Sequence, residues 1–344
     1  MQSMKKLGGK MEELMQWLAS GPRWIINQVQ KNFSEEYDLG EFQQGNRELL
    51  EKDPKFMQLL SDCLKWDTAV LKRHNDAAHP IHKISFLADL GYTIQENHIR
   101  HIVQKINANL SDQEIFQSLC NYPSHFGGSG KDEWVWCLCD APLVLYSLIK
   151  FDGEHKETYL PSYQILESLA RENGWPCAAS PKLGSLKGPG KRTDPCPYAN
   201  LLMLKLAALL PNHRDQSQVN HGINCLLDLW EHSREEHPFL FKMGRNFRKL
   251  KVPLIWYDIL HVAIVLSNYP QAQRDPRFQS MVTIILEKGD SSFRFKSESI
   301  WTKWKGWEFC QKKEPSRWVT FQVMRLLKNI HQWPPQLNGL EKPL

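Results

Sequence analysis

The segment LVLYSLIKF (residues 143–151) decides the fold, because similar apolar segments recur at a regular spacing on both sides of it. The related segments are KISFLADLG (83–91), LMLKLAALL (202–210), HVAIVLSNY (261–269) and FQVMRLLKN (321–329). Successive starts lie 60, 59, 59 and 60 residues apart. Such a regular spacing of apolar segments of helix length is typical of a repeated supersecondary unit.

A second type of segment, with one polar face, lies between the apolar ones. Its copies are HIRHIVQKINANL (98–110), SYQILESLARENG (162–174), VNHGINCLLDLWE (219–231) and RFQSMVTIILEKG (277–289). Apolar residues recur in these copies at helical spacing. A helix that is apolar all round is buried on every side, whereas a helix with a charged face meets solvent. Each repeat is therefore predicted to be a helical hairpin with one inner and one outer helix.

These hairpins predict an all-α fold, an α/α toroid of about six hairpins with an inner and an outer ring of helices. We expect a single domain over residues 1–344. Residues 1–70, with helices in 11–33 and 54–66, complete the ring, five repeats of about 60 residues occupy 71–330, and 331–344 form a tail. An open solenoid is the structural alternative, but it would be expected to carry atypical polar caps.

Composition excludes several broad classes of protein. Among 344 residues, 42% are hydrophobic and 24% charged, so wholesale disorder is excluded. A net charge of +5 is too small to predict nucleic-acid binding. The eight cysteines form no CxxC pair, and the amino terminus lacks a signal-peptide core, so we expect a soluble, cytoplasmic protein with reduced thiols. The longest apolar run, 141–149, falls short of the about 20 residues that a transmembrane helix needs.

One end of the ring is predicted to attract anions. The inner helices are expected to begin at His79-Pro80, Asp140-Ala141-Pro142, Asp194-Pro195, Val252-Pro253 and Glu314-Pro315, since proline is tolerated in the first turn. If the hairpins share one orientation, the five helix dipoles favour an anion at one mouth. The connections 176–193 and 239–252 carry basic and no acidic residues. The plainer interpretation is that these loops are solvated.

The 13 Trp, 15 Phe and 9 Tyr indicate either a wide core or an aromatic-lined cavity. A cavity with a cationic rim suits a hydrophobic small molecule with an anionic head, such as an isoprenoid diphosphate or an acidic lipid, and it would allow transient contact with a membrane surface. The expected ligand-binding residues are Lys191, Arg192, Arg248, Lys249, His74, Trp134, Trp136, Trp256, Tyr257, Trp304 and Trp307.

Histidines and carboxylates at the expected helix starts are the candidate catalytic groups. His79 and His82 open the first inner helix, and Asp140 and Asp258 lie beside tryptophan at later starts. Such groups could act as a general acid and base. In the alternative, they satisfy helix N–H groups as caps.

The stretch GPGKRTDPCPYANLLMLKLAALL (188–210) resembles a stretch of protein prenyltransferase β subunits. With the repeat length, it makes the chain similar to the α/α-toroid superfamily that also contains squalene and terpene cyclases. The resemblance implies that Lys191 contacts a diphosphate and that Asp194, Cys196 and His261 bind zinc. On the residues alone, Asp194 is equally explained as a helix cap and Cys196 as a small buried residue.

Two hypotheses about function follow. The first is a prenyltransferase-like or terpene-cyclase-like protein, a transferase or cyclase acting on isoprenoids, although the chain contains neither DxDD nor DDxxD. The alternative is a non-catalytic toroid that binds an anionic partner, not a nucleic acid, at the same mouth.

Overall fold

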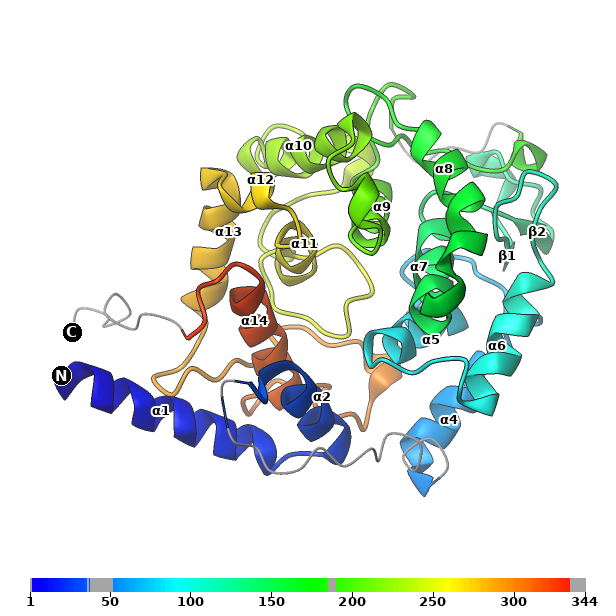
Figure 1. Cartoon of the computed structure of the whole chain (residues 1–344). Helices are drawn as coiled ribbons and strands as arrows, with labels where there is room; N and C mark the ends of the chain where they lie inside the picture. Colours follow the sequence, from blue (N-terminus) through cyan, green and yellow to red (C-terminus); the bar gives the residue numbers. More distant parts are fainter. Residues whose placement is uncertain (1, 36, 38–51, 185–189, 335–344) are drawn as a thin grey trace. The chain divides into compact units, whose positions relative to one another are not determined.

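The computed structural model describes residues 2–35, 37, 52–184 and 190–334. In these residues thirteen α-helices form the architecture, and β1 (Ser118–Cys120) and β2 (Glu133–Val135) are the only strands, paired antiparallel (Figure 1). The prediction of an all-α chain is confirmed. No helix of the described residues combines the length and the apolar character needed to cross a membrane.

The chain forms two compact units. Unit 1 comprises Met1–Asp53, Arg245–Leu254 and Asp258–Leu344, and unit 2 comprises Pro54–Gly244 and Ile255–Tyr257. The predicted single domain over 1–344 stays a prediction. Parts of the predicted N-terminal section (38–51) and tail (335–344), and residues 185–189 of the basic connection, lie outside the described residues.

Unit 2 contains the first three predicted repeats. Its helices are α4 (Pro54–Cys63), α5 (Pro80–Asp89), α6 (Asn97–Asn107), α7 (Ala141–Phe151), α8 (Leu160–Ser168), α9 (Pro197–Ala207) and α10 (Ser217–Glu231). The apolar segments form α5, α7 and α9, and the amphipathic segments form α6, α8 and α10. Helix α7 packs against both α5 and α9, and α9 packs against α10 (Figure 1).

Burial follows the predicted pattern. Every residue of α9 is buried, and in α7 only Lys150 is not. Helix α10 buries one face, whose members include Val219, Leu226 and Trp230. The apolar segments are therefore core helices of this unit, as their composition indicates.

A buried polar network joins three successive repeats. The Nζ atom of Lys205 in α9 lies 3.1 Å from Oδ2 of Asp89 in α5, and 4.3 Å from the ring centroid of Tyr146 in α7. The Tyr146 hydroxyl donates to the other Asp89 oxygen, and Lys205 also donates to Ser85. Because a buried charge is costly without partners, this network favours one alignment of α5, α7 and α9.

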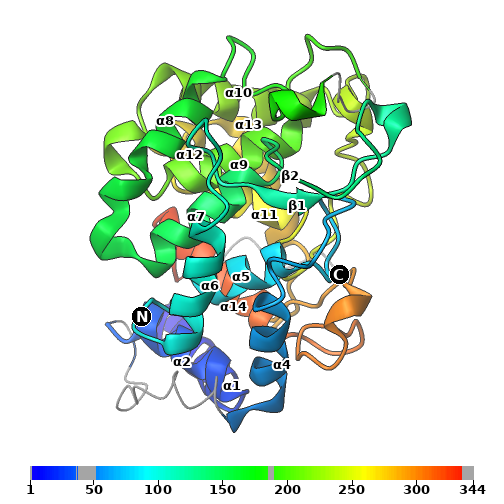
Figure 2. The same ribbon diagram turned by 90° about the vertical axis from the view of Figure 1, so that its right-hand side faces the viewer.

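Short extended segments arrange the loops before these helices. Strands β1 and β2 pair Ser118 with Val135, and Leu71 forms a parallel bridge with Cys120 (Figure 2). Further along, Cys137 pairs with Ala179. These bridges hold the segments that lead into α5 and α7 beside the segment that precedes α9.

Unit 1 contains the remaining predicted repeats. Its helices are α1 (Gln2–Ala19), α2 (Arg23–Phe33), α11 (Ile259–Leu266), α12 (Pro270–Gln273), α13 (Pro276–Leu286) and α14 (Arg317–Asn329). The apolar segments lie in α11 and α14, and the amphipathic one lies in α13. Helix α11 is buried throughout and packs against α13 and α14.

The predicted helix starts are right at Pro80 and in the first turn of α7, and wrong at the other three prolines. Helix α9 begins at Pro197, α11 at Ile259 and α14 at Arg317. Pro195 lies instead in an antiparallel bridge with Pro176. Proline is compatible with extended backbone as well as with a first helical turn, so its position alone does not locate a helix start.

Candidate functional site

The strongest polar cluster of unit 2 is built on the pair formed by His74 and Asp140. Asp140 precedes α7 and is 2% exposed. Its carboxylate accepts from Nδ1 of His74, at 2.9 Å and 3.0 Å to its two oxygens, and from the hydroxyl of Tyr122 at 3.2 Å. The Asp140 side chain makes no capping bond to α7. The capping alternative is therefore wrong for Asp140, whose carboxylate is occupied by side chains from two distant segments.

The Asp140 carboxylate favours the charged form of His74. Burial disfavours the charged imidazole, but the Asp140 carboxylate outweighs it and raises the pKa of His74. The His74 side chain is 28% exposed, whereas that of Asp140 is 3% exposed. Burial and the same carboxylate raise the pKa of Tyr122 well above its usual value. His74 is therefore the member of the cluster that can carry a proton to a ligand.

The other two histidines of this loop have structural bonds. His79 caps α5, with Nδ1 accepting from the Ile81 amide and Nε2 donating to the Ala69 carbonyl. His82 donates from Nε2 to the His74 carbonyl at 2.8 Å. Burial and the nearby His79 lower the pKa of His82 to about 3, so it stays neutral. Of the predicted catalytic pair, His79 is a helix cap and His82 supports the backbone of His74.

Two thiols lie beside this pair. Cys139 directly precedes Asp140, and Cys196 is the N-cap residue of α9. Their Sγ atoms are 3.6 Å apart. Both residues are buried, and both are free cysteines. Cys196 also interacts electrostatically with His74, so the thiols and the acid–base pair form one cluster.

Aromatic rings surround the first turn of α9. The hydroxyl of Tyr198 donates to the Ile255 carbonyl at 2.6 Å, and its ring centroid lies 4.3 Å from that of Trp256. Phe241 stacks on Trp256 at 5.3 Å and meets Tyr257 at 4.7 Å. The predicted ligand-binding residues Trp256 and Tyr257 thus belong to an aromatic group in unit 2.

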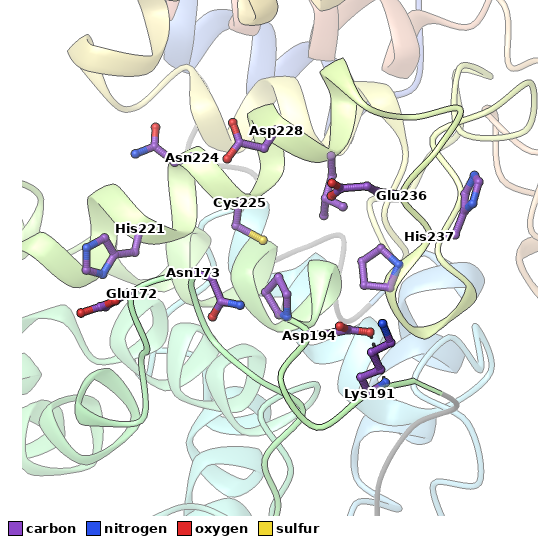
Figure 3. Close-up of a pocket in the computed structure, with 13 residues that line it drawn as sticks. Glu172, Asn173, Lys191, Asp194, His221, Asn224, Cys225, Asp228, Glu236 and His237 are labelled. Atoms are coloured by element: carbon purple, nitrogen blue, oxygen red, sulfur yellow. Dashed lines mark hydrogen bonds between the residues drawn. The ribbon is translucent and has the colours of Figure 1, made fainter.

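Of the predicted diphosphate contacts, Lys191 lines an acidic pocket of about 540 Å³ (Figure 3). The backbone N–H of Lys191 donates to Asp194 at 3.1 Å, which closes a turn at the edge of this pocket. The carboxylates outnumber the single lysine and would repel a diphosphate. The lining residues are Glu172, Asn173, Lys191, Asp194, Pro195, His221, Asn224, Cys225, Asp228, Leu229, Glu236, His237 and Pro238.

The structure gives no metal-binding group for the predicted zinc ligands. Asp194 lines the acidic pocket, whereas the Cys196 thiol lies against Cys139. Within the described ranges, no group of three or more His, Cys, Asp or Glu side chains could hold a metal ion. His261 is a buried residue in the first turn of α11.

Unit 1 carries a second titratable group, at the start of α11. Oδ1 of Asp258 accepts from the amides of Leu260 and His261, both at 3.1 Å, while Oδ2 has no hydrogen-bond partner among the described residues. Burial raises the pKa of Asp258 to about 7. Lys251, whose pKa is lowered by burial, lies 3.2 Å above the ring centroid of Trp301. Asp258 is therefore both a cap and a candidate acid.

The remaining predicted binding residues have varied surroundings. Arg192 and Arg248 are exposed, and Lys249 donates to Asn246 at 2.9 Å. In unit 2, Trp134 lies in β2 and is half-buried, and the indole of Trp136 donates to Gln113 at 3.0 Å. Exposed guanidinium groups can meet an anion from solvent, whereas the Trp136 indole is already hydrogen-bonded to Gln113.

Two of the predicted binding tryptophans belong to the aromatic core of unit 1. Trp304 is 2% exposed, and its ring centroid lies 5.5 Å from that of Trp307. Trp307 in turn stacks on Phe309 and meets Trp24 at 5.6 Å. These rings pack in a core. Of the two explanations for the aromatic residues, a wide core and an aromatic-lined cavity, they fit the first.

Sequence reasoning missed Tyr122, Cys139 and Lys251 as site residues. Cys139 adjoins Asp140 in WVWCLCDAP, so its position beside a candidate acid could have been noticed. Tyr122 reaches Asp140 from a separate loop, and no local pattern marks that contact.

No family model, curated protein or solved structure matches this chain.

Proposed function

We propose that the chain is an α/α-toroid protein of the prenyltransferase and terpene-cyclase type, and that His74 is its catalytic acid. One observation carries the proposal: an imidazole paired with a buried carboxylate that raises its pKa, where successive core helices begin. The all-α fold and the sixty-residue spacing of core helices support the toroid.

The chemistry follows from the two nitrogens of the ring. Nδ1 of His74 donates to Asp140, so the Nε2 proton is the one offered to a ligand. Asp140 orients the ring and favours its charged form. Proton transfer from Nε2 to a double bond or epoxide of an isoprenoid would leave a carbocation. Aromatic faces such as those of Tyr198 and Trp256 stabilise cations.

The proposed ligand is an isoprenoid diphosphate or a related lipid with an anionic head. Lys191 is a poor contact for that head, because it lines a pocket rich in carboxylates. Arg192 of the same unit is a better contact, since it is exposed and residues 176–193 contain no acid. Zinc held by Asp194, Cys196 and His261 stays a prediction, which elemental analysis of the purified protein and of the triple alanine variant tests.

The test of the acid is turnover of named probes. Farnesyl diphosphate, geranylgeranyl diphosphate and squalene are incubated with the protein, and hydrocarbon products are measured by gas chromatography and mass spectrometry. His74→Gln and Asp140→Asn should lose product formation. His155→Gln is the matched control, because His155 pairs with Asp152 at 2.7 Å and is 63% exposed; it should keep full turnover.

The outcomes separate the two hypotheses. Turnover that depends on His74 supports the enzyme. Binding of a probe without turnover supports the non-catalytic toroid and overturns the catalytic role of His74. Absence of both binding and turnover overturns the isoprenoid proposal.

A further inference from the structure

We propose that Cys139 and Cys196 are a redox modification site, at which a peroxide converts the two thiols into a disulfide that joins the start of α7 to the start of α9. The proposal rests on the placement of two free, buried sulfurs from distant segments. Their Sγ atoms are 3.6 Å apart although the residues are 57 positions apart in the chain. The two Sγ atoms need to approach by only about 1.5 Å to reach the length of an S–S bond.

The backbone around the two thiols is well fixed. The amide of Cys196 donates to the Trp175 carbonyl at 2.8 Å, and the amide of Leu138 donates to the Ala178 carbonyl at 2.9 Å. The segment 175–178 is thus hydrogen-bonded to the backbone beside both cysteines and holds these two backbone segments in place. Small side-chain rotations can bring the sulfurs together while these hydrogen bonds stay intact.

A third cysteine gives the oxidant a path to the pair. Cys177 lies in the segment between Cys139 and Cys196, and it is only half-buried. Its neighbours Pro176 and Ala179 form bridges with Pro195 and Cys137, so Cys177 lies in a segment paired with both cysteine segments. Thiol–disulfide exchange passes oxidation from one sulfur to a neighbouring one. An oxidant that reaches Cys177 can therefore deliver the disulfide to the buried pair.

The reaction balances with hydrogen peroxide as the oxidant. The Cys177 thiol is oxidised to a sulfenic acid, and the peroxide is reduced to water. One thiol of the pair attacks the sulfenic sulfur, and a second water leaves. The other thiol of the pair then attacks this mixed disulfide, which forms the S–S bond of the pair and releases Cys177 as a thiol. A dithiol reductant reverses the reaction by exchange.

The test is peptide mapping of the intact chain after treatment with hydrogen peroxide and alkylation of the remaining thiols. Trypsin places the three cysteines on separate peptides, DEWVWCLCDAPLVLYSLIK (132–150), ENGWPCAASPK (172–182) and TDPCPYANLLMLK (193–205). We expect a crosslink between the first and the third that disappears with dithiothreitol. Fragmentation between Cys137 and Cys139 assigns the bond.

Variants sharpen the assignment. Cys139→Ser and Cys196→Ser should each abolish the crosslink, and Cys177→Ser should slow its formation. Cys310→Ser is the matched control, since Cys310 is also half-buried but lies in unit 1. Oxidation confined to Cys177 or Cys310, or a sulfenic or sulfinic acid without a crosslink, would overturn the proposal. The crosslink is measured in the wild-type protein, so this test does not depend on whether a variant folds.

A consequence for activity rests on the proposed function. Because Asp140 directly follows Cys139, movement of Cys139 into a disulfide shifts the carboxylate that holds His74. Oxidised protein should lose turnover and regain it with dithiothreitol. Mass spectrometry detects the crosslink whether or not the protein turns over any probe, so failure of one proposal is distinguishable from failure of the other.

Discussion

Replacing Lys205 by methionine tests the network that aligns the core helices of unit 2. The ammonium lies 3.1 Å from the Asp89 carboxylate. With an effective dielectric constant of about 20, the Coulomb attraction at that distance is about 5 kcal/mol. The variant removes the cation from a carboxylate that is only 17% exposed. We expect the free energy of unfolding to fall by about 3–5 kcal/mol, as for other buried pairs that lose one partner.

The assay is urea unfolding followed by far-UV circular dichroism. Asp89→Asn combined with Lys205→Met completes a double-mutant cycle, and the double variant should be less destabilised than the sum of the single variants, because neither charge is then left alone. Lys105→Met is the matched control: Lys105 pairs with Asp67 at 2.6 Å, but the side chains are 35% and 46% exposed. Surface pairs contribute about 0–1 kcal/mol. A Lys205→Met effect no larger than that of Lys105→Met would refute the role of the network.

Three further predictions concern pH and packing. The raised pKa of His74 stabilises the fold below the unfolded value of about 6.5, and this contribution is lost as pH rises through the folded pKa; His74→Gln should remove that part of the pH dependence of unfolding. Asp258 binds its proton more tightly in the folded chain, so stability should fall as pH rises toward about 7, and Asp258→Asn should abolish this slope. In Gly222→Ala the new Cβ would lie 2.6 Å from Cζ3 of Trp175, which should cost about 1–3 kcal/mol by overpacking, measured by urea unfolding.

These predictions have clear contrary outcomes. Unchanged pH profiles in His74→Gln or Asp258→Asn would show that the corresponding group titrates alike in the folded and unfolded chain. Gly153 has nothing within 4 Å of an added Cβ, so Gly153→Ala is the packing control. An equal effect of the two alanine substitutions would contradict the close contact at Trp175.

The core helices could be predicted because their signal is local. Leu143 to Phe151 and the four related segments are mostly apolar, and each contributes most of its residues to a largely buried helix. The first residue of each helix was harder to predict, because it depends on partners outside the helix. Ser316, rather than the preceding proline, caps α14 by accepting from the Val319 amide at 3.2 Å.

The candidate site could be predicted only in part, because its decisive contacts join distant residues. Asp140 and His74 were both candidate residues, yet their pairing spans 66 positions. Cys139 and Cys196 are 57 positions apart, and the spacing of the cysteines in the sequence does not indicate their contact. A repeat brings the same point of each hairpin to neighbouring places, so equivalent positions at successive helix starts were the one available signal. Asp140 and Cys196 occupy such positions.

The three histidines in and after the loop before α5 have different chemical roles, because their surroundings differ. Three histidines lie within nine residues, and their shared side chain would suggest a shared function. Both ring nitrogens of His79 are hydrogen-bonded to backbone groups, and burial keeps His82 neutral. Only His74 has a carboxylate partner together with partial exposure. A proton donor needs a charge that burial does not remove and a path to its acceptor. His82 supports the His74 backbone and His79 caps α5; on the proposed function, substitution of His82 should weaken turnover only by displacing His74.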